Sequence, residues 1–214
     1  MVKWLSFLSH PDGDPAQFND TAITGAFSWN TLNLYAKSLG THVSYLETVG
    51  LKSGFARLSS PSATLLADVG NITPAYQPGH AHAESLCFEF SLGSQRLLVN
   101  SGISTYAEGK ERCEQRSTAA HNTVEVAQLD SSEVWKSFRV ARRAEVSDVK
   151  LNPSIPCLYL EAAHNGYRGR TPISFHRRRW EMDQNSLLIT DTLEGPEIPA
   201  LVYLHFYPGI TLEF

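Results

Sequence analysis

The sequence predicts a mainly β protein: a large antiparallel β-sandwich preceded by a short helical segment. Two observations carry this prediction. From about residue 54 onward, apolar and polar residues alternate with a period of two, which is typical of half-buried strands. Turn-forming residues separate these strands at short intervals, as in sandwiches built from consecutive hairpins. We therefore expect a helical segment and linker over residues 1–50 and a sandwich domain over residues 51–214.

The N-terminal part of the chain has helical rather than strand spacing. Residues 2–8 and 29–39 place apolar side chains at intervals of three and four. Ser28 or Asn30 can cap the second helix, and Gly40 fits its C-terminal stop. Because two short helices cannot bury their apolar faces alone, we expect them to be the remnant of a larger helical domain.

The predicted strands follow one another with short connections. They are 54–58, 63–69, 85–92, 95–99, 122–128, 134–141, 144–150, 157–163, 172–183, 186–193 and 199–207. Leu92-Gly93-Ser94-Gln95 and Asp183-Gln184-Asn185-Ser186 indicate hairpin turns. The long connection over residues 100–121 is polar and irregular, and loops of this length in a domain are often functional.

Composition narrows the classes of protein to consider. The net charge of −4 gives no general signal for nucleic acid, and no apolar run reaches the length of a membrane span. The three cysteines are widely spaced and form no C-x-x-C pattern, so neither a disulfide framework nor a zinc ribbon is indicated. Arginines cluster, as at 177–179. A guanidinium group binds carboxylate or sulfate in bidentate fashion, so such clusters suit a polyanionic ligand, and the alternative is a solvated strand face with scattered ion pairs.

Three histidines lie in two short motifs that flank the long connection. On an extended segment, side chains two residues apart share a face, so His80 and His82 can converge on one site. A hairpin of strands 85–92 and 95–99 would bring Asn100 to the same end. His121, across the loop, can reach that end as well.

We therefore predict a metal site formed by His82, Asn100 and His121, with His80 free beside it for proton transfer. Zinc suits two imidazoles and one oxygen ligand. A neutral amide binds zinc less well than a carboxylate, so Glu84 is a possible substitute ligand or a partner that orients a ligand. A cation of this kind would be the protein's cofactor.

The same motifs resemble the C-terminal half of heparinase II/III-like polysaccharide lyases. The segments that carry the resemblance are Gly79-His80-Ala81-His82-Ala83-Glu84, Leu97-Leu98-Val99-Asn100-Ser101-Gly102, Thr105-Tyr106, Arg116-Ser117-Thr118-Ala119-Ala120-His121-Asn122-Thr123-Val124, His164-Asn165-Gly166-Tyr167, His176-Arg177-Arg178-Arg179, His10-Pro11-Asp12-Gly13 and Phe18-Asn19-Asp20. Together they cover essentially the whole chain.

The resemblance implies a helical (α/α) toroid followed by a β-sandwich, with the active site in the cleft between them. The helical segment of this chain would then be the tail of the toroid. His80 resembles the catalytic histidine that the sandwich supplies, and His82, Asn100 and His121 fall on the zinc ligands. The family usually has Asp where Asn100 and Glu84 stand.

The activity implied by the resemblance is cleavage of uronic-acid-containing glycans by β-elimination. The expected partners are an acidic polysaccharide and the helical domain of the same protein, and the expected location is the cell envelope or periplasm. Tyr106 in the long loop is a second catalytic candidate, and Arg116 is a candidate for binding a substrate carboxylate. Because the helical part would hold further catalytic groups, we expect this fragment to be inactive alone.

Two other functions fit parts of the sequence. A cupin-type metalloenzyme also has H-x-H on a strand, but Glu89 lies beyond the usual spacing after His82, and no Pro-x-Gly precedes His121. A non-catalytic carbohydrate-binding or interface module is the other, since sandwiches often serve that role and fold alone does not decide function. Such a module has no need of clustered histidines.

Overall fold

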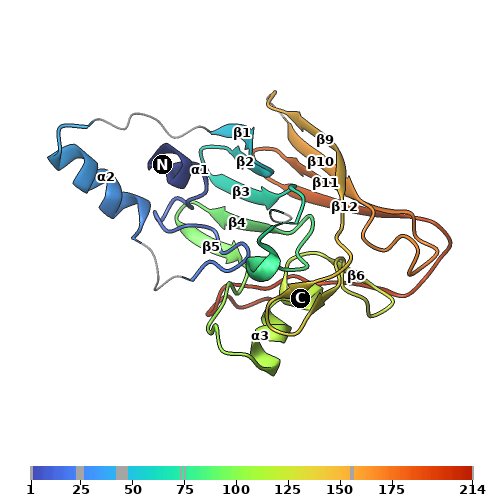
Figure 1. Cartoon of the computed structure of the whole chain (residues 1–214). Coiled ribbons are helices and arrows are strands. Elements are labelled where there is room, and N and C mark those ends of the chain that lie inside the picture. Colours follow the sequence, from blue (N-terminus) through green and yellow to red (C-terminus); the bar gives the residue numbers. More distant parts are fainter. Residues whose placement is uncertain are drawn as a thin grey trace.

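Two antiparallel sheets face each other and form the core of the protein (Figure 1). The computed structural model describes residues 2–22, 27–41, 48–72, 74, 76–154 and 157–213. The first sheet has the order β1-β2-β3-β4-β5, with β1 Val49–Lys52, β2 Phe55–Ser59, β3 Ala63–Asp68, β4 Phe88–Leu92 and β5 Gln95–Leu98. The second has the order β12-β11-β10-β9, with β9 Val146–Asn152, β10 Leu158–His164, β11 Phe175–Met182 and β12 Leu187–Glu194.

Smaller elements surround the two sheets. Two short pairings lie outside them, β6 (Val124–Val126) with β13 (Ala200–Val202) and β7 (Val134–Trp135) with β8 (Arg139–Val140). The helices are α1 (Val2–Phe7), α2 (Trp29–Ser38), α3 (Lys110–Gln115) and the short 3-10 turns η2 (Pro78–His80) and η3 (Thr118–Ala120). The predicted mainly β sandwich is therefore confirmed.

The core between the sheets is apolar and closely packed. Leu58, Leu65 and Phe88 of the first sheet and Leu160 and Trp180 of the second belong to one buried cluster. The rings of Phe88 and Trp180 meet edge to face with centroids 6.2 Å apart, a favoured arrangement for aromatic pairs. Burial of these large side chains is the main force that holds the two sheets face to face.

Most predicted strands and both hairpins are confirmed, and the differences are informative. The turn at Gly93, with φ of +53°, joins β4 to β5, and Asp183 accepts the backbone N–H groups that close the turn between β11 and β12. The predicted single strand over 134–141 is instead a hairpin, β7–β8, because the chain turns back at Lys136, which has a positive φ of 47°. The extra strand β1 pairs with β2 and was not predicted.

Helix α2 has the predicted caps. Ser28 accepts a hydrogen bond from the backbone N–H of Thr31, and Gly40 takes the left-handed conformation with φ of +72°.

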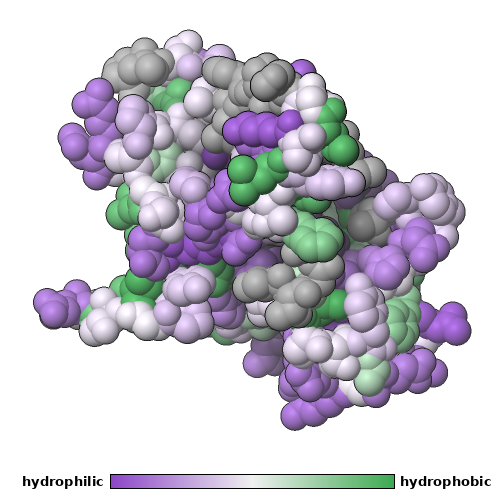
Figure 2. Space-filling model, turned by 90° about the vertical axis from the view of Figure 1, so that its left-hand side faces the viewer, coloured by the Kyte–Doolittle hydropathy of each residue, from purple (hydrophilic) through white to green (hydrophobic). Residues whose placement is uncertain are grey.

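The apolar side chains of Leu34, Tyr35 and Leu39 are more than half exposed. On the face that carries these N-terminal helices, apolar side chains form patches separated by polar ones (Figure 2). None of the described helices has the length and apolar character needed to cross a bilayer.

Candidate active site

The segment that holds the two neighbouring histidines is a turn followed by extended chain. Pro78 begins the 3-10 turn η2, which ends at His80, and Ala81 then returns to an extended conformation. The prediction that His80 and His82 lie on one strand was therefore wrong, because the Pro-Gly pair bends the chain before them. The side chain of His80 is 52% exposed, whereas that of His82 is fully buried.

Asp20 brings the two imidazoles together despite this difference. His80 donates its Nδ1–H to Oδ2 of Asp20 at 2.7 Å, and His82 donates its Nε2–H to Oδ1 at 2.8 Å. Arg112, which is completely buried, binds both carboxylate oxygens. Burial opposes ionisation of Asp20, but hydrogen bonds from His82, Arg112 and His80 outweigh it and hold the pKa of this carboxyl well below its usual value.

A buried network on the first sheet holds the loop that carries Asp20. His10 bridges Ser91 Oγ at 2.6 Å and Glu89 Oε2 at 2.8 Å, all inside the protein. Arg96 binds both carboxylate oxygens of Asp12 on the same N-terminal segment. These contacts fasten residues far apart in sequence, so the position of Asp20 depends on the fold of strands β4 and β5.

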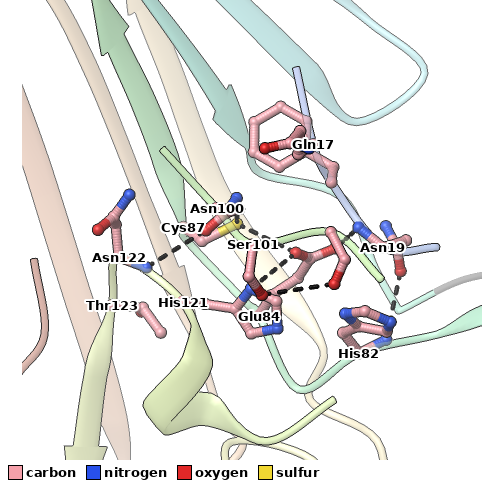
Figure 3. Close-up of polar contacts among 12 residues, drawn as sticks. Gln17, Asn19, His82, Glu84, Cys87, Asn100, Ser101, His121, Asn122 and Thr123 are labelled. Carbon is pink, nitrogen blue, oxygen red and sulfur yellow. Dashed lines mark hydrogen bonds and ion pairs between the residues drawn. The ribbon is translucent and has the colours of Figure 1, made fainter. Parts of the chain in front are cut away.

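Behind Asp20 lies a cluster of three buried metal-type ligands, His82, Glu84 and His121. One potential ligand atom from each lies within 4.8 Å of the others. The imidazole rings have centroids 5.2 Å apart, and His121 Nδ1 is 3.3 Å from Glu84 Oε2. Figure 3 shows Glu84 and His121 pointing toward each other, with His82 beside them. The predicted convergence of His82 and His121 on one site is present.

Three ring nitrogens in this cluster have no hydrogen-bond partner among the described residues. They are Nδ1 of His82 and both nitrogens of His121, of which Nδ1 lies at ion-pair distance, 3.3 Å, from Oε2 of Glu84. Buried polar atoms are nearly always satisfied, so a group of orphaned nitrogens needs an explanation. Because His82 donates its Nε2–H to Asp20, the lone pair of the neutral ring is on Nδ1 and can bind a cation. The donor set therefore fits a metal ion such as zinc.

The electrostatics of the cluster also fit a cation. Burial lowers the pKa of His82 and holds that of His121 well below its usual value, so both rings are neutral and able to bind a metal. Burial and the nearby Asp68 raise the pKa of Glu84 well above its usual value. A bound cation would reverse that shift and keep the Glu84 carboxyl ionised.

Asn100, the predicted oxygen ligand, lies beside the cluster with its amide already engaged. Its Nδ2 donates to Cys87 Sγ at 3.6 Å, and its Oδ1 accepts the backbone N–H of Asn122 at 3.4 Å. Cys87 in turn donates to Glu84 at 3.6 Å. In this arrangement Asn100 supports Glu84 through Cys87 (Figure 3).

Tyr106 and Arg116 occupy different environments. Tyr106 is 54% exposed, and its ring meets that of His80 edge to face with centroids 6.1 Å apart, so it lies where a catalytic group could act. Arg116 is completely buried and donates to the carbonyl oxygens of Ala81, Lys136 and Arg139. That position favours a supporting role for Arg116 over direct contact with substrate.

A cavity of about 530 Å³ adjoins the cluster on the side of strand β3, lined among others by His82, Glu84 and Asp68. Burial raises the pKa of Asp68 to about 7, although the carboxylate accepts a hydrogen bond from the backbone of Gly70. The cavity gives water and small ions a route to the buried carboxylates.

Sequence reasoning missed two residues of this site, Asp20 and Arg112. The Phe18-Asn19-Asp20 segment was recognised only as a loop and as part of the resemblance. Nothing in local spacing links Asp20 to residues more than sixty positions away. The one available signal was its acidic side chain in a turn-rich segment before the helix at 29–39.

Comparison with known proteins agrees with the fold and the motifs. The heparinase II/III-like C-terminal domain matches residues 46–214. A comparison with curated protein sequences finds no match. Among solved structures, the chain is similar to heparinase III, the BT4657 gene product, at 19% identity and a TM-score of 0.74, covering 100% of this chain and 35% of that one.

Two further solved structures are similar over most of the chain. Heparan sulfate lyase HepC from Pedobacter heparinus has 14% identity and a TM-score of 0.65, with 88% of this chain and 31% of that one covered. Another heparinase III structure has 13% identity and a TM-score of 0.64, with 91% and 33% covered. The chain thus spans about a third of the length of the structures it matches, 35%, 31% and 33%. Because the domain match covers most of its residues, the chain belongs to the heparinase II/III-like family and contains its C-terminal domain.

Proposed function

We propose that this chain supplies the sandwich side of the active site of a polysaccharide lyase that cleaves uronic-acid-containing glycans by β-elimination. The observation that carries the proposal is the position of His80. It is a half-exposed imidazole that lies next to Tyr106 and donates its Nδ1–H to Asp20, the same carboxylate that accepts a hydrogen bond from the buried His82. A ring fixed at one nitrogen and open to solvent at the other is suited to proton transfer.

The proposed reaction removes the C5 proton of a uronic acid and expels the sugar linked at C4. Because His80 donates its Nδ1–H to Asp20, the lone pair of the neutral ring is on Nε2, and on this half-exposed side chain it can accept a proton from substrate. The Tyr106 phenol, beside that ring, can return a proton to the departing C4 oxygen. Cationic and hydrogen-bonding groups that stabilise the charge developing on the uronate carboxyl lower the barrier.

We further propose that His82, Glu84 and His121 hold a structural zinc ion, with Asn100 as the alternative oxygen ligand. Glu84 is preferred because a carboxylate binds zinc better than an amide and because the Asn100 amide already has two partners. When bound, the ion would neutralise the buried carboxylate and fix the His80 segment in place.

The proposal places the other half of the active site in a helical domain of the same protein. Exposed Leu34 and Tyr35 on α2, and Leu39 directly after it, are available to pack against further helices. On this view the present fragment is inactive alone, the partner glycan is acidic, and the protein acts in the cell envelope or periplasm. The similar structure HepC is that of a heparan sulfate lyase, so heparan sulfate is the first polymer to test.

The test is to incubate the full-length protein with heparan sulfate, alginate and other uronate polymers and to record the ultraviolet absorbance of unsaturated uronate. The proposal expects product from at least one polymer and its loss in His80→Ala. Retained binding of the polymer in His80→Ala would show that the variant is folded. Binding by the parent protein with no unsaturated product from any uronate polymer would favour the carbohydrate-binding module instead.

A further inference from the structure

The β7–β8 hairpin presents an aromatic ring and two cations next to the His80 segment. Trp135 is 46% exposed, the guanidinium of Arg139 lies 5.3 Å from its ring centroid, and the ammonium of Lys136 lies 5.8 Å from it. A cavity of about 430 Å³ opens here, lined by Pro78, Glu108 and the hairpin residues 135–140. Pro78 is the first residue of the turn that ends at His80, so this cavity begins close to the candidate catalytic ring.

Within the described part of the chain, Arg139 and Lys136 have no acidic partner. No ion pair and no side-chain hydrogen bond joins either cation to another described residue, and Arg139 is held by the indole face alone. Arg179 offers a contrast, because it also lies over an aromatic ring, that of Tyr159 at 4.3 Å, but pairs with Glu161 and Glu181. A stacked guanidinium with free N–H groups is prepared to bind an anion in bidentate fashion.

Two buried arginines tie the hairpin rigidly to the His80 segment. Arg116 donates from one guanidinium to Ala81 on that segment and to Lys136 and Arg139 on the hairpin. Arg112 donates to the carbonyl oxygens of Gly79 and Ser137.

Ring contacts reinforce this connection. The guanidinium of Arg112 lies 5.3 Å from the ring centroid of Phe138 on the hairpin and 5.4 Å from that of Tyr106. The carbonyl oxygen of Phe138 is 3.7 Å from the position that a Cβ on Gly79 would take. Burial of the charged Arg112 and Arg116 side chains is costly unless their guanidinium nitrogens form hydrogen bonds, and each of these nitrogens does so here. The hairpin is therefore held in a defined position relative to His80.

From this arrangement we propose that the Trp135 ring, Arg139 and Lys136 form a subsite for an anionic hexose unit adjacent to the unit that reacts at His80. The flat indole packs against the C–H face of a pyranose ring, and Arg139 binds its carboxylate or sulfate. The inference rests on the proposed function, since it takes the ligand to be an acidic glycan. Two cations against one acidic side chain, Glu108, make the cavity selective for a negatively charged sugar.

The experiment measures binding by calorimetry, using full-length protein that carries His80→Ala so that bound glycan is not consumed. The probes are a heparan sulfate hexasaccharide and a hexamer of mannuronate, with neutral cellohexaose for comparison. Trp135→Ala and Arg139→Gln are each expected to weaken binding of an acidic hexamer by about tenfold, the factor that corresponds to about 1.4 kcal/mol. Trp135→Phe should retain most of the affinity, and Arg139→Gln should also reduce the salt dependence of binding.

Arg179→Gln is the matched control, because it removes the same charge from a ring-stacked arginine on the second sheet. It should leave the affinity unchanged.

The subsite is refuted if neither acidic probe binds, if Trp135→Ala and Arg139→Gln bind like the parent, or if Arg179→Gln weakens binding as much as Arg139→Gln. Binding that depends on Trp135 in a protein that yields no unsaturated uronate would overturn the lyase reaction and leave the subsite standing. Formation of unsaturated uronate by the parent protein, together with unchanged binding in Trp135→Ala and Arg139→Gln, would support the lyase reaction and overturn the subsite.

Discussion

The protein buries two pairs of histidines, and they differ in how their ring nitrogens are satisfied. His82 and His121 sit at one end of the sandwich, and three of their nitrogens make no hydrogen bond with a described residue, although Nδ1 of His121 lies 3.3 Å from Oε2 of Glu84. His164 and His176 sit on β10 and β11, equally buried, and all four of their nitrogens are engaged.

The second pair forms a directed chain of hydrogen bonds. The backbone N–H of Gly166 donates to His164 Nδ1 at 3.1 Å, His164 Nε2–H donates to His176 Nδ1 at 3.0 Å, and His176 Nε2–H donates to Asp191 at 2.7 Å. Each ring is neutral and has one fixed tautomer. Burial of a histidine pair is thus not by itself a sign of function. Buried ring nitrogens that make no hydrogen bond and converge on one position, by contrast, indicate a candidate metal site.

The largest expected effect is loss of metal from the first pair. His121→Ala removes a ligand, and we expect zinc affinity, measured by competition with a chromophoric chelator, to fall by more than about 100-fold. His164→Leu, the matched change in the second pair, should bind zinc as the parent does. Equal zinc affinity in the parent and His121→Ala would mean that the first pair is not the metal centre.

Asp20→Asn should have the next largest effect, because Asp20 orients His82 through a hydrogen bond without being one of the three proposed ligands. Loss of such an outer carboxylate typically costs about 10–100-fold in metal affinity. The same variant weakens the hold on His80, so turnover by the full-length protein should fall as well. Asp14→Asn, a change on the same loop away from the site, serves as the control, and an equal loss in both variants would contradict the assigned role.

The second pair should matter for stability instead. His164→Leu leaves Nδ1 of His176 and the backbone N–H of Gly166 without their partner, and a buried unsatisfied group costs about 1–3 kcal/mol. Urea unfolding of the parent and the variant at pH 7.5 measures the difference. An unchanged free energy of unfolding would show that the chain of hydrogen bonds contributes nothing net.

The pH dependence of that difference has a definite sign. Burial lowers the pKa of both His164 and His176 below the usual 6.5, so the unfolded chain takes up protons at a higher pH than the folded one. Their stabilising contribution is therefore fully present above pH 6.5 and is lost as the pH falls below it. The unfolding free energy of His164→Leu should fall less steeply below pH 6.5, by up to about 1.4 kcal/mol per pH unit. A parallel pH profile in parent and variant would contradict the lowered pKa.

Asn100→Asp should have the smallest effect on zinc affinity if Glu84 is the oxygen ligand. Glu84→Gln, the matched change, should weaken zinc binding clearly. A large gain in affinity from Asn100→Asp together with no loss from Glu84→Gln would exchange the roles of the two residues.

Features that depend on local pattern could be predicted from the sequence, whereas most long-range contacts could not, with the approach of His121 to His82 as the exception. The period of two revealed most strands, and the turn at Gly93 and the cap at Ser28 follow from local chemistry. Asp20 reaches His82 across 62 positions, a contact that only the folded first sheet creates. Glu84 lies within 4.8 Å of ligand atoms of His82 and His121, whereas the Asn100 amide is engaged by Cys87 and Asn122, and these long-range contacts could not be read from the spacing of the motifs.

The most direct test of the metal centre is diffraction from zinc-soaked crystals at wavelengths on either side of the zinc absorption edge. The account predicts one strong anomalous peak between the side chains of His82, Glu84 and His121, and none at His164 and His176. Absence of a peak at the first cluster, or a peak only at the second, would contradict it.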